Sequence, residues 1–472
     1  MRPSKISISL ILIFLPLLLG GLIPLAPGTS AVTQAAQKAV RFELEQNWYP
    51  AAENWRILLA VEPWRADAWE HLGRAEYELS HYDQAAYAFE QARKYNELSY
   101  PDVMLLGKSY LQLNRGDDAR QLWREISASA PGDFDFLMKI AADQREIGDF
   151  HGTVSTLLNA YALKPEDPQV NYLLGIHLAV IQPQSAVRYL ERGKSLGGTE
   201  AELADSLLNE ISQPGEAQLY RTLRIGQILY NAKIWDLAAQ AFAVVAQSSE
   251  SSAYAWALWG EALQHVNGSG LEQLQKALQL DPQSDTANAL MALYFRRQNK
   301  PEMALPYLYK AVAVSPQEPS WQIELGNTLA ETGDLKSALA YLQKATVTAP
   351  DDPLAWQSLA QFCFTRNVDI STGLEAARKA LALDPADPQL MDLMGMGLMI
   401  NGDLDSAERF IRQAVQTAPE EAAFHLHLGQ VFLQQKDCSQ AAVELRRAIE
   451  LSQDERITSN ANRLLSDYCS GY

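Results

Sequence analysis

The residues whose spacing could support catalysis are few, and their context does not favour it. Residues 193–197 read GKSLG and match the G-x-S-x-G pattern that presents Ser195 as a nucleophile. Such a serine needs a strand before it and a helix after it, whereas this segment follows a helical pattern and its glycines are typical of a helix C-terminus. The same residues end like a phosphate-binding loop, but Arg188 stands where that loop requires glycine. We therefore predict neither a serine nucleophile nor a phosphate site.

Metal ligation has no better support in the sequence. His425 and His427 are two residues apart, so on a helix they point to nearly opposite sides and cannot hold one metal ion together. The remaining histidines are scattered, and the three cysteines do not have the spacing of metal ligands. No stretch reads as a strand or as a glycine-rich cofactor domain. We expect no catalytic residue, no metal ion and no cofactor, and therefore no enzyme.

A pair of short helices is the element that the chain repeats, and residues 319–350 show it most clearly. Leu325 and Leu329 lie on one face of a first helical segment. Residues 333–334 (GD) end that helix and begin a second one, and Pro350 closes the unit because proline cannot continue a helix. A helix pair this short cannot bury both of its apolar faces alone. It needs neighbours of the same kind.

The sequence supplies those neighbours at a constant step of 34 residues. A small residue after a large apolar one recurs at this step, which lets one helix backbone approach another closely. Members of this series are Gly73, Gly107, Ala141 and Gly175, and later Gly395 and Gly429.

One unit carries nearly the whole pattern of a known repeat, in Trp69, Leu72, Gly73, Ala85, Phe89 and Ala92. The chain resembles the tetratricopeptide repeat family, whose units read aromatic-x-x-Leu-Gly-x-x-aromatic, then Ala, an aromatic residue, Ala and Pro. The resemblance covers nearly everything after residue 32. It implies an all-α fold: an α-solenoid (superhelix) of about twelve helix-turn-helix repeats with a C-terminal capping helix. Fold does not specify function, because the family is defined by packing positions.

The repeat register divides the chain into five parts. The register breaks after Gly175, because the next equivalent glycine, Gly226, is one and a half periods away. Half a period is a single helix, so we expect a kink or a subdomain boundary there. The expected parts are an N-terminal leader (1–31), a first array of about five repeats (32–198), an extra helix and linker (199–215), a second array of about seven repeats (216–454), and a capping helix and tail (455–472).

The N-terminal segment predicts export. Arg2 and Lys5 precede an apolar stretch at 6–25, and residues 29–31 (TSA) resemble a cleavage site for a signal peptidase. The stretch also has the length of a membrane-spanning helix, so a retained anchor is the alternative to a cleaved signal peptide. In either case we expect the repeats to lie outside the cytoplasm, secreted or in the cell envelope, with contact to the membrane only through this segment.

The acidity of the chain narrows the choice of partners. A net charge of −18 and a pI near 4.9 exclude a nucleic-acid-binding protein of the usual kind, which needs a clustered basic surface.

Cys438 and Cys469 could approach each other where the last helix packs on the preceding turn. A disulfide between them and two free thiols are both compatible with the sequence.

The expected working surface is the inner groove, which the first helix of each tetratricopeptide unit lines. Its non-core positions in the last three units are Leu354, Gln357, Gln361 and Phe364, then Gln389, Asp392, Met396 and Met399, then Ala423, Leu426, Gln430 and Leu433. The apolar members of this set, Phe364, Met396, Met399, Leu426 and Leu433, would form an adjacent strip suited to peptides or helices. The alternative is that they pack against neighbouring helices.

A second patch could lie after the register break. Tyr220, Tyr230 and Tyr254 take equivalent inner positions and could stack on an extended ligand, including a sugar chain, or pack between helices.

We predict a non-enzymatic extracytoplasmic scaffold that binds protein or peptide segments. The alternative function is an accessory role in envelope polysaccharide assembly or export, with a glycan as ligand.

Overall fold

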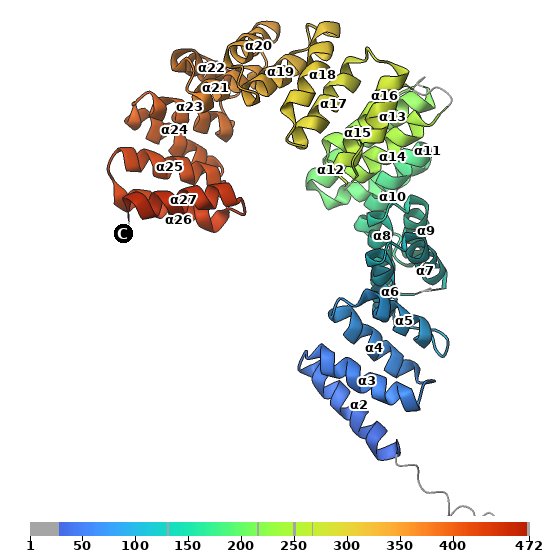
Figure 1. Ribbon diagram of the computed structural model, residues 1–472. Helices are drawn as coiled ribbons and strands as arrows, with labels where there is room; N and C mark the ends of the chain where they lie inside the picture. The colour runs from blue at the N-terminus through green and yellow to red at the C-terminus, as the bar shows by residue number, and fades with distance from the viewer. Residues whose placement is uncertain (1–27, 130–131, 215–216, 249–251, 267, 470–472) are drawn as a thin grey trace, which may run out of the picture. The chain divides into compact units, whose positions relative to one another are not determined.

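The computed structural model describes residues 28–129, 132–214, 217–248, 252–266 and 268–469, and these residues form 26 α-helices, one short 3-10 helix and no strand (Figure 1). The all-α solenoid predicted from the sequence is confirmed. No helix in this described part is long and apolar enough to cross a membrane. The apolar stretch at 6–25, on which the export prediction depends, lies outside the described residues.

The chain divides into two compact units, residues 1–217 and 218–472. In the first unit, five hairpins follow one another, each packed on the next, and the single helix α12 comes after them. The helices of this unit are α2 (Gly28–Leu44), α3 (Trp48–Val61), α4 (Ala66–Glu78), α5 (Tyr82–Ala92), α6 (Tyr100–Gln112), α7 (Gly116–Ser129), α8 (Phe134–Glu146), α9 (Phe150–Leu163), α10 (Pro168–Ile181), α11 (Pro183–Gly193), η1 (Lys194–Leu196) and α12 (Gly198–Ser212).

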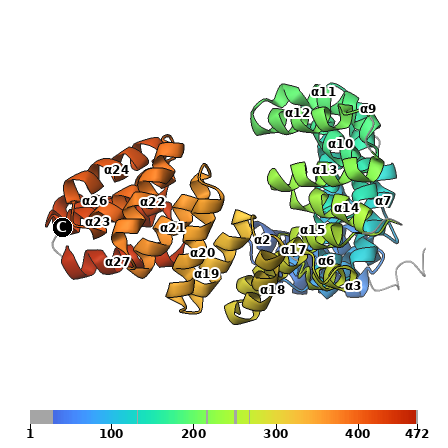
Figure 2. The same cartoon turned by 90° about the horizontal axis from the view of Figure 1, so that it is seen from above.

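The second unit holds seven hairpins and ends on the single helix α27. Successive hairpins from α19 onward lie side by side in chain order in both views (Figure 1, Figure 2). The helices of this unit are α13 (Gln218–Asn231), α14 (Trp235–Ala246), α15 (Ala253–Gln264), α16 (Leu271–Leu280), α17 (Asp285–Arg297), α18 (Pro301–Val314), α19 (Pro319–Glu331), α20 (Leu335–Thr348), α21 (Pro353–Arg366), α22 (Ile370–Leu383), α23 (Pro388–Ile400), α24 (Leu404–Thr417), α25 (Ala422–Gln434), α26 (Cys438–Leu451) and α27 (Glu455–Tyr468). We refer to the first helix of each hairpin as its A helix and to the second as its B helix.

Glycine and aspartate form the turn between α19 and α20. Gly333 adopts a φ of 91° between α19 and α20, a conformation that a residue with a Cβ rarely takes. Asp334 then caps α20, because its Oδ1 accepts the backbone N–H of Ser337 at 3.1 Å. This hydrogen bond holds the pKa of Asp334 below its usual value. Residues within this hairpin therefore fix its turn.

A close contact between the A helix and the B helix recurs in six of the twelve hairpins. A small residue of the A helix faces a large side chain of the B helix that lies sixteen positions further along, as Gly73 faces Phe89. A Cβ added at these glycines would overlap the facing side chain, so the two helices can approach this closely only because the Cβ is missing. The pairs are Gly73 with Phe89, Gly107 with Trp123, Gly226 with Phe242, Gly326 with Leu342, Gly395 with Ile411, and Gly429 with Leu445.

The contact between Gly107 and Trp123 gives a stability prediction. In Gly107→Ala, the new methyl group would lie 2.5 Å from the fully buried indole of Trp123. We expect the free energy of unfolding to fall by about 1–2 kcal/mol, because overpacking costs more than alanine gains in helix propensity. Gly116→Ala is the control, since its Cβ would meet only the end of Arg120 at 3.9 Å. Equal thermal unfolding midpoints for the two variants by circular dichroism would contradict this account.

Candidate functional site: a hollow on three consecutive A helices

The A helices α21, α23 and α25 enclose a hollow of about 340 Å³ within the second unit. These helices pack on one another in succession, so equivalent positions one repeat apart lie next to each other. The lining residues are Gln357, Gln361, Phe364, Thr365, Gln389, Asp392, Leu393, Met396, Phe424 and His427. We refer to this surface as the A-helix hollow.

The apolar side of the A-helix hollow is rigidly supported. Phe364 is only 4% exposed, and its ring lies against Gly373 of α22 and Gly397 of α23. A Cβ at Gly373 would be 2.7 Å from that ring, so the ring packs directly on the backbone of α22. Met396 is half-buried and is the adaptable part of this wall, because its unbranched thioether fits many shapes. The wall can therefore receive an apolar side chain.

Three glutamines form the polar side of the A-helix hollow. Gln357 is half-buried, and Gln361 and Gln389 are exposed. Their side-chain amides make no hydrogen bond to any described residue. An amide has both donor and acceptor atoms, so these groups match the alternating N–H and C=O groups of a peptide backbone.

A hydrogen bond within the hollow's lining joins two A helices. His427 of α25 places its Nδ1 2.8 Å from Oδ2 of Asp392 in α23. Asp392 is 5% exposed, and its second oxygen, Oδ1, is buried without a hydrogen-bond partner among the described residues. A buried acceptor of this kind costs free energy until a donor reaches it. Oδ1 of Asp392 thus lacks a hydrogen-bond donor among the described residues.

The five apolar residues of the expected strip do not form one continuous exposed surface. Phe364 and Met396 border the A-helix hollow, whereas Met399 (9% exposed) and Leu426 (6%) are buried between helices. Gln430 and Leu433 are half-buried and do not line the hollow. The strip breaks because α25 must also bury residues against the capping helix α27, which Leu426 and Leu433 contact within one cluster.

Sequence reasoning missed four lining residues: Thr365, Leu393, Phe424 and His427. His427 could have been found from its spacing. It follows Asp392 by 35 residues, about one repeat, and positions one repeat apart face each other on adjacent A helices. His427 and His425 do point to different partners, since His425 Nδ1 lies 2.7 Å from Glu444 Oε2 in α26.

The three tyrosines of the second expected patch have unlike surroundings. Tyr220 (52% exposed) and Tyr254 (38%) remain accessible, and the Tyr254 hydroxyl accepts the Gln227 amide at 2.9 Å. Tyr230 is half-buried against Trp235, and its hydroxyl donates to Glu261 at 3.1 Å. Burial and the Glu261 carboxylate raise the pKa of Tyr230 above its ordinary value. The hydroxyl of Tyr230 is therefore already occupied inside the protein.

The segment 193–197 forms a helix end. Helix α11 finishes at Gly193, η1 follows, and the Ser195 hydroxyl donates to the carbonyl of Arg192 at 3.0 Å. Lys194 pairs with Asp205 of α12 at 2.5 Å. The side chains of Ser195 and Lys194 therefore make local structural contacts.

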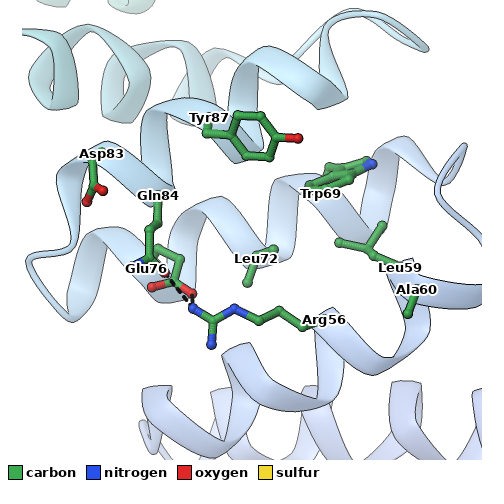
Figure 3. Close-up of a pocket in the computed structure, with 9 residues that line it drawn as sticks. All are labelled: Arg56, Leu59, Ala60, Trp69, Leu72, Glu76, Asp83, Gln84 and Tyr87. Carbon is green, nitrogen blue, oxygen red and sulfur yellow. Dashed lines mark hydrogen bonds and ion pairs between the residues drawn. The ribbon is translucent and has the colours of Figure 1, made fainter.

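A second hollow, of about 520 Å³, lies in the first unit between α3, α4 and α5 (Figure 3). Leu59 and Leu72 form its floor, and the rings of Trp69 and Tyr87 meet edge to face with centroids 5.8 Å apart. The buried carboxylate of Glu76 is bound by Arg56 on one side and by His81 at 2.9 Å on the other. No buried polar atom of the described lining residues lacks a partner. In this respect it differs from the A-helix hollow, where Oδ1 of Asp392 lacks a partner among the described residues.

Cys438 and Cys469 lie together at the end of the second unit. Both are free thiols in the structure, and the Cys438 Sγ donates to the carbonyl of Tyr468 at 3.0 Å. Burial, together with a hydrogen bond and the charge from Cys438, raises the pKa of Cys469 to about 11. Cys363 is fully buried between helices, and burial raises its pKa to about 11 as well.

Comparison with protein families identifies the repeat. The model described as "Tetratricopeptide repeat" matches residues 44–103, and the model described as "Cilia and flagella-associated protein 70 C-terminal domain", a tetratricopeptide-type model, matches residues 268–464. The chain is a tetratricopeptide repeat protein. Chains built from such repeats serve in general as scaffolds for protein interaction. No curated protein matches this sequence significantly.

Several solved structures of tetratricopeptide repeat proteins are similar to this chain. MamA from Desulfovibrio magneticus RS-1 is 24% identical, covers 36% of this chain and 97% of its own, and has a TM-score of 0.32. The Cut9–Hcn1 hetero-tetramer of the APC/C is 15% identical over 92% of this chain and 96% of its own, with a TM-score of 0.41. Yeast Tom70 is 12% identical over 93% and 97%, with a TM-score of 0.40. At these values the comparisons indicate no shared partner.

The last tetratricopeptide unit gives a redox prediction. Oxidation should join Cys438 to Cys469 and raise the free energy of unfolding by about 3–4 kcal/mol on the chain-entropy account. Because the pKa of Cys469 is about 11, the reactive thiolate is scarce near neutral pH, and the bond should form faster at about pH 9 than at about pH 7. Peptide mapping without reductant measures the bond. A bond to Cys363, or no bond between Cys438 and Cys469, would contradict the geometry, and Cys438→Ser is the control.

Proposed function

We propose that the chain is a non-enzymatic scaffold that holds a peptide segment of a partner protein in the A-helix hollow. The observation that carries this proposal is the combination of an apolar wall at Phe364 and Met396 with three glutamine amides that have no partner among the described residues. Binding sites for peptides combine apolar pockets for side chains with polar groups for the backbone. The A-helix hollow offers both within reach of each other.

The dimensions of the A-helix hollow indicate the length of the ligand. Packed helices are about 10 Å apart, so α21, α23 and α25 span about 20 Å between the outer axes. An extended chain rises about 3.3 Å per residue, so about six residues cross the three helices. A ligand of this length would contact every A helix that lines the hollow.

We also propose that this binding takes place outside the cytoplasm. Support comes from the sequence of the N-terminal segment, where basic residues precede a long apolar stretch. Cell fractionation together with N-terminal sequencing of the mature chain checks this. Recovery in the cytoplasm with an intact Met1 would refute it.

A role in envelope polysaccharide assembly is the second proposal, and the exposure of Tyr220 and Tyr254 is what favours it. Aromatic rings at an accessible surface can stack on sugar rings, and their hydroxyls can hydrogen-bond to the sugar. Glycan binding that is lost in Tyr254→Ala would support this role. Binding of peptides without any binding of glycans would count against this role.

Met396 gives the test of peptide binding. In Met396→Ser, a capped peptide selected on the unmodified chain should lose about ten- to hundredfold in affinity, because the apolar contact of one side chain contributes about 1.5–3 kcal/mol. Isothermal titration measures this affinity. Met303→Ser is the matched control, since Met303 is 50% exposed on α18 and lies outside the A-helix hollow. Equal losses in the two variants would remove the hollow from the proposal.

A further inference from the structure

The carboxylate of Asp392 differs from four other buried carboxylates of this chain in the side chain that contacts it. At four other buried positions an arginine of the same chain supplies the positive charge. These pairs are Glu76 with Arg56, Asp102 with Arg74, Asp149 with Arg124, and Glu261 with Arg297. Asp392 has one imidazole, that of His427, on Oδ2.

The missing partner lies at a specific atom. At Asp102, Arg74 reaches both oxygens, with Nε at 2.5 Å from Oδ1 and Nη2 at 2.6 Å from Oδ2. At Asp392, Oδ1 is buried and has no hydrogen-bond partner among the described residues. The ten lining residues of the A-helix hollow include no lysine and no arginine. A buried carboxylate oxygen thus lies at the hollow, and none of the described residues donates to it.

We propose that the A-helix hollow selects peptide segments carrying an arginine or lysine, whose cationic group donates to Oδ1 of Asp392. This inference rests on the proposed function and names the class of its ligand. A hydrogen bond between a cation and a carboxylate is stronger than one between neutral groups, and the buried position of Asp392 strengthens it further. A glutamate at the same ligand position is disfavoured, because two carboxylates would then face each other.

The rest of the A-helix hollow fits the remainder of such a segment. The methylene groups of a lysine or arginine can cover Leu393 and Met396 while the charged end reaches Asp392. The unpaired amides of Gln357, Gln361 and Gln389 then remain for the peptide backbone. The net charge of −18 favours the approach of a cationic segment at low ionic strength.

Capped hexapeptide libraries that share one fixed residue test this inference on the purified full-length chain. The fixed residue is arginine, lysine, citrulline or glutamate, and acetylated and amidated ends remove the terminal charges. We expect the unmodified chain to bind the arginine and lysine libraries at least about tenfold more tightly than the citrulline and glutamate libraries. Citrulline keeps the shape of arginine without its charge, so this comparison needs no variant of the protein.

Asp392→Asn should remove this preference, while Asp405→Asn should keep it. The control changes the net charge equally, because Asp405 is an exposed residue of α24 in the same repeat and lies outside the hollow. Equal binding of all four libraries, still weakened by Met396→Ser, would overturn the cation selection and leave peptide binding standing. Failure of the unmodified chain to bind any library would overturn the proposed function itself.

Discussion

The absence of a single Cβ, at the same place in six of the twelve hairpins, is the constraint on which the rest of this structure depends. Gly326 lets Leu342 lie directly on the backbone of α19, and Gly395 does the same for Ile411 on α23. The B helix is thereby drawn onto one side of the A helix. The opposite side of the A helix is left for its neighbours in the stack and for ligands. The repeated glycine therefore determines which surface remains available in the hairpins that contain it.

Charge pairing distinguishes the two hollows of the chain. In the first unit, Arg56 and His81 bind the buried carboxylate of Glu76, and no buried polar atom of the described residues that line this hollow lacks a partner. In the second unit, His427 contacts Oδ2 of Asp392, and Oδ1 has no hydrogen-bond partner among the described residues. Asp392 Oδ1 is one of ten buried side-chain atoms without a hydrogen-bond partner among the described residues, and its place at the wall of a hollow supports the proposal of a ligand.

Much of the fold could be predicted from the sequence because the repeat is encoded locally. The glycine at 34-residue intervals, the Gly-Asp turn at 333–334 and the proline at 350 each act on one hairpin, and the twelve hairpins follow in the expected order. The candidate site was harder to predict because it depends on contacts between repeats. Met399 and Leu426 have the spacing of exposed positions, yet neighbouring helices bury them. The pair of Asp392 and His427 becomes visible only when α23 and α25 are placed side by side.

Hydrogen–deuterium exchange on the full chain, with and without a saturating capped peptide, tests the central claim most directly. If the A-helix faces carry recognition, added protection should be confined to α21, α23 and α25, the three helices that line the hollow. Amide exchange reports on such local stabilisation even where the backbone does not move. Protection centred instead on α3, α4 and α5, or spread evenly over both units, would contradict the account.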